Sequence, residues 1–293
     1  MRFAAVRRLL LIVSLIVGLQ FAAAPMLPAA QAAEEKVTVV FWPNGGNLDT
    51  ATKTVSPGAK IGALPVPTRS RYVFVGWSDR RAHGGTLISA STLAPSVAGT
   101  VTYFARWAPR PVYQFDKRWA NARYRNTVRG SGCGLTAATI LVRSLGTASG
   151  SYQVTPATAA KWSLRHGFAT TAPGKTKDPF FTQWPATYGV TLTRLNKRKL
   201  QKLSSTQRRA LHAKARAAVA EGNWVLAFMK PGNWTQHGHF IVWYDTAGSR
   251  ALVRDPNATK PAKTRAKTSL LQSQVWRYWI VKVPPERKLF VLP

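Results

Sequence analysis

The residue best suited to covalent chemistry is Cys133, the one cysteine in a chain of 293 residues. It opens the run Cys133–Gly146, whose glycine-rich start and terminal glycine predict a helix. A helix amino terminus favours the thiolate, which is the nucleophilic form, and the flanking Gly132 and Gly134 let a substrate carbonyl approach the backbone. The alternative is a buried, inert cysteine. Because Ser131 and two glycines are poor core neighbours, we interpret Cys133 as a nucleophile.

A thiol nucleophile needs a base, and His239 and Asp255 are spaced to supply a base with its orienting acid. The β-type runs 240–244 and 251–254 flank a polar stretch at 245–250, which predicts a hairpin. That turn places positions 239 and 255 almost opposite each other, where cross-strand Cβ atoms lie about 4.5–5.5 Å apart. The carboxylate would then fix the imidazole tautomer and stabilise the imidazolium that forms when the thiol proton is accepted.

Other interpretations of these residues stay open at this point. The alternative for His239 is a strand-end histidine bonded to backbone, and for Asp255 it is turn initiation before Pro256, which is compatible with catalysis. His237 is the alternative base. Since it precedes Gly238 and lies outside the strand run, we expect it at the rim of a site or facing substrate. The order of cysteine, histidine and acid is the papain-like order.

The composition limits what these residues can belong to. At 293 residues with 45% hydrophobic content, the chain has room for one large or two small folded domains. A single cysteine excludes an intramolecular disulfide framework, a multi-cysteine zinc site and an all-cysteine iron–sulfur cluster. The 42 Lys and Arg against 10 Asp and Glu give a net charge of +32, which favours polyanionic partners.

The first segment predicts export. Residues 1–33 combine Arg2, Arg7 and Arg8 with the apolar run Leu9–Leu19 and an A-x-A-like site, which is the pattern of a signal peptide. The alternative is a membrane anchor, but the apolar run is shorter than the ~20 residues that a bilayer needs. We therefore expect a secreted, extracellular protein associated with the cell surface, with no transmembrane domain after cleavage.

Residues 34–110 predict a small β-rich module. Three β-type runs, at 37–42, 72–77 and 101–107, are separated by Gly, Pro and Asn, and none shows sustained helical periodicity. The segment resembles the Listeria–Bacteroides repeat, an InlB B-repeat-like module of bacterial surface proteins. The matching residues are Asn44-Gly45-Gly46, Pro67-Thr68-Arg69, Phe74-x-Gly76-Trp77 and Tyr103-Phe104-Ala105-Arg106-Trp107. This resemblance implies a β-grasp-like, non-enzymatic spacer or adhesion module, and we interpret its tryptophans as core residues.

Residues 111–293 predict an α+β domain, because helices come first, at 133–146 and about 206–221, and strands later. This segment resembles the papain-fold cysteine peptidases of the bacteriocin-processing (double-glycine leader) family, in their secreted stand-alone branch. The matching residues are Gln114-Phe115-Asp116 with Trp119 and Tyr124, Ser131-Gly132-Cys133-Gly134-x-Thr136, Gly238-His239-Phe240 and Val253-Arg254-Asp255-Pro256.

The resemblance implies a role for each matching polar residue. It makes Cys133 the nucleophile, His239 the base, Asp255 the orienter and Gln114 an oxyanion-hole donor, which a neutral amide can be without becoming charged. The alternative for Gln114 is a polar residue at a strand edge. Two departures are Leu135, where the family often has proline, and the lack of transporter domains, which argues against leader processing coupled to export.

The basic residues concentrate in the same segment. Residues 111–293 hold 30 Lys and Arg against 6 Asp and Glu, a net charge of +24. A run of charge is usually a solvated face, but this one-signed excess predicts binding to anionic cell-envelope polymers, such as teichoic-type phosphates or anionic lipids, and export argues against nucleic acid as a physiological partner. The clusters comprise Arg194, Lys197, Arg198, Lys199, Lys202, Arg208, Arg209, Lys214, Arg216, Lys260, Lys263, Arg265 and Lys267.

The sequence thus predicts a secreted cysteine peptidase that hydrolyses a peptide or amide bond through a thioester, acting on a peptide or cell-wall peptide at the bacterial surface. We expect no cofactor and no metal. The alternative is a non-catalytic adhesion or wall-binding protein with a degenerate papain-like domain, and the intact Cys, His, Asp and Gln set argues against it. An acyl transferase using the same thioester chemistry is a third possibility.

Overall fold

The fold is given by a computed structural model, which describes residues 35–82, 84–124, 126–169, 176–257 and 264–289. The described residues belong to one compact unit that begins at Glu35. The predicted signal peptide at 1–33 lies outside them. Within the described ranges, no helix is long and apolar enough to cross a bilayer.

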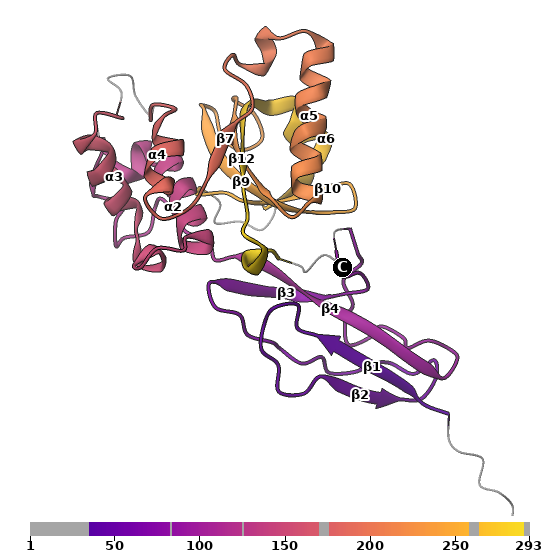
Figure 1. Ribbon diagram of the computed structural model, residues 1–293. Coiled ribbons are helices and arrows are strands. Elements are labelled where there is room, and N and C mark those ends of the chain that lie inside the picture. The colour runs from indigo at the N-terminus through magenta and orange to yellow at the C-terminus, as the bar shows by residue number, and fades with distance from the viewer. Residues whose placement is uncertain (1–34, 83, 125, 170–175, 258–263, 290–293) are drawn as a thin grey trace, which may run out of the picture. The chain divides into compact units, whose positions relative to one another are not determined.

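The amino-terminal module is a four-stranded sheet in the order β2-β1-β4-β3 (Figure 1). Strand β1 runs parallel to β4, and the other two pairings are antiparallel. The sequence predicted three of these strands and missed the half-exposed β2, which has no apolar alternation. The bounds are β1 Val37–Trp42, β2 Thr52–Val55, β3 Tyr72–Ser78 and β4 Gly99–Pro109.

Aromatic residues form the core of the module. Trp77 and Trp107 are fully buried, and both pack near Phe74, at ring distances of 5.4 and 5.8 Å. The Asn-Gly-Gly turn is needed for this packing, because a Cβ on Gly46 would meet the Trp107 ring and the Thr68 carbonyl. The interpretation of both tryptophans as core residues is confirmed. The predicted boundary at residue 110 falls one residue after β4 and stays a prediction.

The second part contains a six-stranded antiparallel sheet in the order β11-β10-β9-β8-β12-β7. A short pairing of Arg123–Tyr124 (β5) with Asn126–Thr127 (β6) precedes it in the chain. The strand bounds are β7 Leu192–Arg194, β8 Trp224–Met229, β9 His239–Ala247, β10 Arg250–Arg254, β11 Arg265–Lys267 and β12 Val275–Val281.

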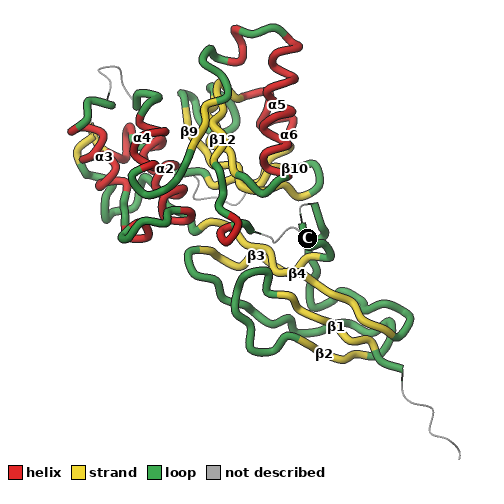
Figure 2. The backbone as a smooth tube through the Cα atoms, viewed as in Figure 1, coloured by secondary structure: helices red, strands yellow, loops and turns green. Residues whose placement is uncertain are grey.

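Helices cover both faces of this sheet, with α2, α3 and α4 on one side and α5 and α6 on the other (Figures 1 and 2). Successive residues of β9 therefore enter different cores: Phe240 and Val242 pack with α2, whereas Ile241 and Trp243 pack with α5. The helix bounds are α1 Val128–Ser131, α2 Cys133–Leu145, α3 Pro156–Arg165, α4 Phe180–Ala186, α5 Ser205–Ala220 and α6 Thr268–Gln274.

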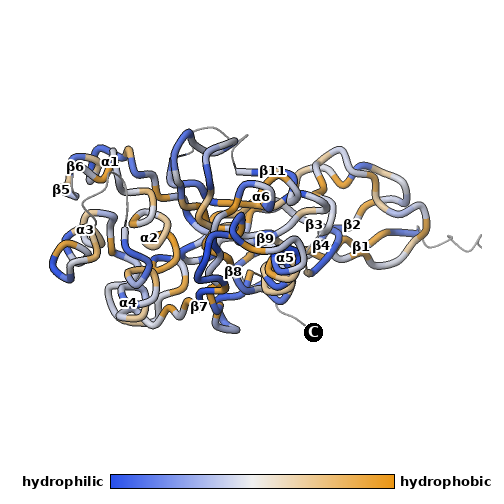
Figure 3. The backbone as a smooth tube through the Cα atoms, turned by 90° about the horizontal axis from the view of Figure 1, so that it is seen from above, coloured by the Kyte–Doolittle hydropathy of each residue, from blue (hydrophilic) through white to orange (hydrophobic). Residues whose placement is uncertain are grey.

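The two predicted helices are stabilised in different ways, one by burial and the other by its N-terminal cap. Helix α2 combines apolar residues with a few polar ones, and 11 of its 13 residues are buried; it lies across the second sheet from α5 (Figure 3). Helix α5 is mostly exposed, and its start is fixed by a capping box between Ser204 and Gln207. Both lie within a residue of their predicted bounds, and the predicted α+β class with a β-rich amino-terminal module is confirmed.

The predicted hairpin exists but is wrong in register. Strand β9 continues to Ala247, so only Gly248 and Ser249 form the turn, and a bulge lies between Leu252 and Val253. After the bulge, Arg254 pairs with Val242.

Candidate active site

Cys133 is the first residue of α2, as predicted. The preceding helix α1 is capped by the Thr127 side chain and ends at Gly132, whose N–H donates to the Val128 carbonyl at 2.7 Å. A Cβ on Gly132 would overlap that carbonyl, so the tight step from α1 into α2 requires glycine. This step leaves the Cys133 side chain partly exposed at the end of a helix that is otherwise buried.

Gly134 has a different role from the one expected. It is fully enclosed, and a Cβ there would lie 2.9 Å from the Phe181 ring and 3.2 Å from the Phe240 ring. The glycine therefore lets aromatic side chains pack against the first turn of α2. It does not open the backbone to a substrate carbonyl, so this expectation was wrong.

His239 and Asp255 form a buried pair beside Cys133. The Nε2 atom of His239 lies 2.5 Å from Oδ1 of Asp255, and each residue is 3% exposed. The same carboxylate oxygen accepts the backbone N–H of Asn257 at 2.8 Å, which fixes its orientation. His239 also shares a side-chain hydrogen bond with Cys133.

Charge at this site is set by opposing effects. Burial disfavours the imidazolium, but the hydrogen bonds to Asp255 and to Cys133, with the charges of both, outweigh it and raise the pKa of His239 to about 10. At neutral pH the ring is therefore protonated between a carboxylate and the sulfur. A thiol beside a protonated imidazole and a buried carboxylate can act as a nucleophile with a proton donor at hand.

The contact between His239 and Asp255 arises differently from the prediction. Because Arg254 is paired with Val242, the backbone of Asp255 is not opposite that of His239. The two side chains instead reach toward each other along the sheet, past the end of β10. The pair Gly248-Ser249 is a sequence signal of a two-residue hairpin turn and would have moved the predicted centre of the turn, whereas the bulge has no such signal.

Gln114 lies in a turn, so the strand-edge alternative does not apply. Its backbone N–H donates to the Pro256 carbonyl at 2.9 Å, and its side-chain Nε2 donates to the Arg129 carbonyl at 2.8 Å. Pro256 follows Asp255, and Arg129 lies four residues before Cys133, so these bonds tie Gln114 to both sides of the site. An amide nitrogen has two N–H groups, so a second one remains for a ligand oxygen.

Several predicted residues lie outside this constellation. His237 is exposed, as expected for a rim position. Arg194 is not part of a free basic face, because its guanidinium bonds Asp178 at 2.9 Å, and Lys199 lies 3.7 Å above the Trp276 ring. Among the residues that the structure describes, no group of three or more His, Cys, Asp or Glu could hold a metal ion.

An aromatic wall beside the site, formed by Phe181, Phe228, Phe240 and Trp276, was not predicted from the sequence. Phe240 stacks on Phe228 at 4.5 Å and meets Phe181 at 4.4 Å. A Cβ on Gly238 would lie 2.8 Å from Phe228 and 3.1 Å from Trp276. This wall adjoins the glycines next to Cys133 and His239, and only the aromatic run after His239 hinted at it.

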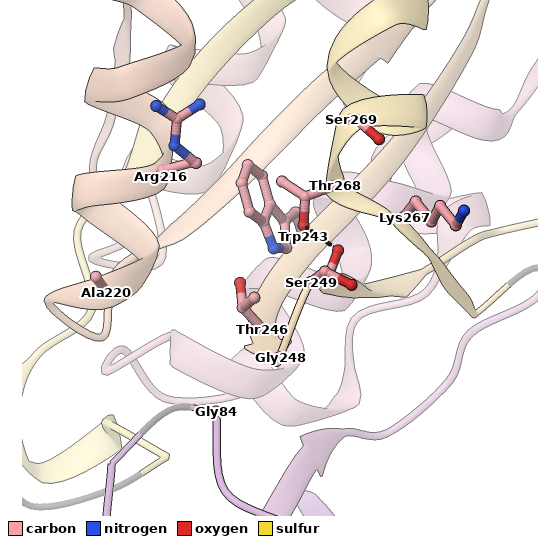
Figure 4. A pocket seen from close by; sticks show the side chains of 10 residues that line it. All are labelled: Gly84, Arg216, Ala220, Trp243, Thr246, Gly248, Ser249, Lys267, Thr268 and Ser269. Atoms are coloured by element: carbon pink, nitrogen blue, oxygen red, sulfur yellow. Dashed lines mark hydrogen bonds between the residues drawn. The ribbon is translucent and has the colours of Figure 1, made fainter.

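A surface cavity of about 470 Å³ lies elsewhere, lined by α5, α6 and the β9–β10 turn (Figure 4). The Trp243 indole at its centre is fully buried, and Lys267 points away from it (Figure 4). None of Cys133, His239, Asp255 and Gln114 lines the cavity. The reactive groups are therefore not associated with it.

Comparisons with known proteins agree with both resemblances. A model of the Peptidase_C39 like family matches residues 110–281, and a model of the Listeria-Bacteroides repeat domain matches residues 38–105. No curated protein matches the chain.

Two solved structures are similar. The peptidase domain of Streptococcus ComA, a bi-functional ABC transporter involved in a quorum sensing pathway, is 12% identical, with 53% of this chain and 93% of that one covered and a TM-score of 0.32. A putative C39-like peptidase from Bacillus anthracis is 12% identical, with 59% and 94% covered and a TM-score of 0.31.

Proposed function

Because the chain belongs to the Peptidase_C39 like family, we propose that it is a cysteine peptidase that hydrolyses a peptide or amide bond through a thioester on Cys133. The observation that carries the proposal is the position of His239, which is bonded to Cys133 on one side and to Asp255, 2.5 Å away, on the other. A histidine that activates a thiol needs both contacts, one that orients the ring and one through which it exchanges a proton with the sulfur.

The chemistry follows from the protonation state of the pair. The Cys133 sulfur attacks the substrate carbonyl carbon, and the carbonyl oxygen takes up the negative charge. His239 then gives its proton to the leaving nitrogen as the C–N bond breaks, which yields an amine and a thioester. The neutral imidazole next takes a proton from water, whose oxygen attacks the thioester carbon. The C–S bond then breaks, which releases the carboxylic acid and restores the Cys133 sulfur beside the protonated His239.

The proposal assigns two donors to the oxyanion. One is the second N–H of the Gln114 amide, and the other is the backbone N–H of Cys133. The latter belongs to the first turn of α2, where backbone N–H groups have no intrahelical acceptor. Fixed donors aimed at a developing charge stabilise the transition state more than the ground state.

We further propose that the protein is exported and acts at the bacterial surface. The support is the signal-peptide pattern of residues 1–33, the match to a Listeria-Bacteroides repeat and the net charge of +32, which would hold the protein on anionic envelope polymers.

The test is a digest of a peptide library and of purified cell wall, read by mass spectrometry, with the wild-type chain and with Cys133→Ala. We expect new carboxyl and amino termini with the wild type only. Cys133→Ser is the matched control, because it replaces the thiol with a hydroxyl of similar size, and it should also give no products. Products that persist in Cys133→Ala would show that the nucleophile lies elsewhere. A folded wild type that cleaves no substrate would favour the non-catalytic adhesion alternative.

A further inference from the structure

The module bonds directly to the C-terminal end of α2, the helix that begins at Cys133. Arg71 donates from Nη1 to the Gly146 carbonyl at 2.8 Å and, more weakly, to the Arg143 carbonyl at 3.4 Å. The hydroxyl of Tyr72 donates its single proton between the Arg287 carbonyl at 3.0 Å and, more weakly, the Ser144 carbonyl at 3.3 Å. The last four carbonyls of a helix have no intrahelical partner, so two side chains of the module complete this end of α2.

The backbone of the module is strained where it makes these contacts. In the described ranges, Asn44 and Arg71 are the non-glycine residues with positive φ, at 49° and 69°. Such a conformation persists only where the surroundings dictate it. Arg71 makes the bond to α2, and the Asn44 side chain donates to the Leu289 carbonyl at 3.2 Å, in the segment that follows the second sheet.

A second set of contacts fixes β9, the strand that begins at His239. Arg106 of β4 forms a buried ion pair with Asp245, at 3.8 Å between Nη1 and Oδ2, with both side chains less than a tenth exposed. The backbone N–H of Gly84 donates to the Thr246 carbonyl at 3.2 Å. Both bonds lie at the end of β9 far from His239.

A third contact fixes the end of β10. The Nε of Arg254 donates to the carbonyl of Pro109, the last residue of β4, at 2.6 Å. Arg254 immediately precedes Asp255 in the chain. The module therefore contacts each of the three elements that carry or adjoin a member of the Cys-His-Asp set.

We propose that the module is a positioning part of the catalytic unit, in which Arg71 sets the placement of Cys133 through α2. The inference rests on the proposed function. It assigns to the module a role that the resemblance to a spacer or adhesion repeat does not include.

Helix α2 can transmit a displacement from its C-terminal end to Cys133, because it is short and rigid. A helix of 13 residues is about 20 Å long at 1.5 Å per residue. A tilt of about 3° at one end moves the other end by about 1 Å, and a misplacement of that size costs roughly 10²-fold in rate. The proposal therefore requires only that loss of the bonds from Arg71 tilts α2 by about this much, which would be enough to separate Cys133 from His239.

The test uses the full chain with Arg71→Asn. Asparagine accepts positive φ, so the substitution removes the guanidinium and keeps the backbone conformation. We expect the alkylation rate of Cys133 by iodoacetamide at neutral pH, and kcat on a cleaved peptide, to fall by about 10- to 100-fold at temperatures well below unfolding, with KM unchanged. Arg71→Lys keeps one cationic donor and should recover most of both rates.

Arg80→Asn is the matched control, because Arg80 is an exposed arginine of the same module and should leave both rates unchanged. Tyr72→Phe gives an independent reading, since it removes only a hydroxyl, and should lower the alkylation rate by severalfold. A lower melting temperature with unchanged alkylation and kcat in Arg71→Asn and Tyr72→Phe would overturn the proposal and leave the module a mere stabiliser.

Alkylation needs no substrate, so the two proposals fail separately. A wild type that alkylates rapidly but cleaves nothing refutes the proposed function. An Arg71→Asn variant that cleaves and alkylates like the wild type refutes the positioning role.

Discussion

Asp255→Asn tests whether the carboxylate acts through its charge or only through its position. Oδ1 of Asp255 accepts two hydrogen bonds, from His239 Nε2 and from the Asn257 backbone N–H. Both partners are donors, so the oxygen of an asparagine amide is held at the same place. The imidazole tautomer is therefore kept, and what is lost is the negative charge.

The magnitude follows from that loss. A hydrogen bond to a charged group contributes about 1.5–3 kcal/mol, and removing the charge raises the barrier for every step that has imidazolium character. Since each 1.4 kcal/mol is about a factor of ten, kcat should fall by roughly 10- to 100-fold. Asp255→Ala removes the acceptor altogether and frees the ring, so its loss in kcat should exceed that of Asp255→Asn.

The assay is the pH dependence of Cys133 alkylation and of kcat for the wild type and the two variants. The alkaline limb of the wild type should lie near the pKa of His239, about 10, because the imidazolium is lost there. In Asp255→Asn this limb should move to lower pH. An asparagine variant as inactive as the alanine variant, or an alkaline limb that does not move, would refute the reasoning.

Three further outcomes are expected. Gln114→Ala should lower kcat by roughly 10²–10³ with little change in KM, as for an oxyanion donor; a change confined to KM would contradict this. Stability should depend on pH through His239, because its folded pKa of about 10 exceeds its ordinary value of about 6.5. The stabilisation is complete below about pH 6.5 and is lost as pH rises through about 10, so the melting temperature should fall over that range and fall less in His239→Gln. Wall binding should collapse between 0.1 M and 1 M salt, where the Debye length shortens from ~10 Å to ~3 Å, whereas hydrolysis of a small neutral peptide should persist; binding that ignores salt would exclude the basic surface as the anchor.

Local patterns were enough to predict the parts of the site that depend on neighbours in sequence. The Gly-bounded run after Cys133 is helical, and the aromatic run after His239 is a strand. The register between β9 and β10 was predicted wrongly for two reasons: the turn is at Gly248-Ser249, later than the predicted centre although this pair is a known turn signal, and a bulge without a sequence signal shifts the pairing further. The predicted contact of His239 with Asp255 is present nevertheless, because it joins the two side chains and does not require their backbones to lie opposite each other.

Long-range contacts were the main omission. Arg71 and Arg106 are ordinary charged residues by sequence, and only the fold brings them to α2 and β9. The predicted basic clusters also include cations that are bonded within the fold. Arg194 pairs with Asp178, and Lys199 lies over the Trp276 ring. Charge counting cannot separate a cation bonded within the fold from one facing solvent.

The absence of a second cysteine determines how oxidation of Cys133 can be reversed. Cys133 is the one cysteine of the chain and is partly exposed. When a thiolate is oxidised to a sulfenic acid, a neighbouring thiol rescues it by condensing to a disulfide, and without one it proceeds to the irreversible sulfinic acid. This chain has no such neighbour. Under the proposed function, the number of turnovers per molecule in an oxidising medium is therefore limited by the supply of small thiols from outside, because oxidation of Cys133 beyond the sulfenic acid is irreversible.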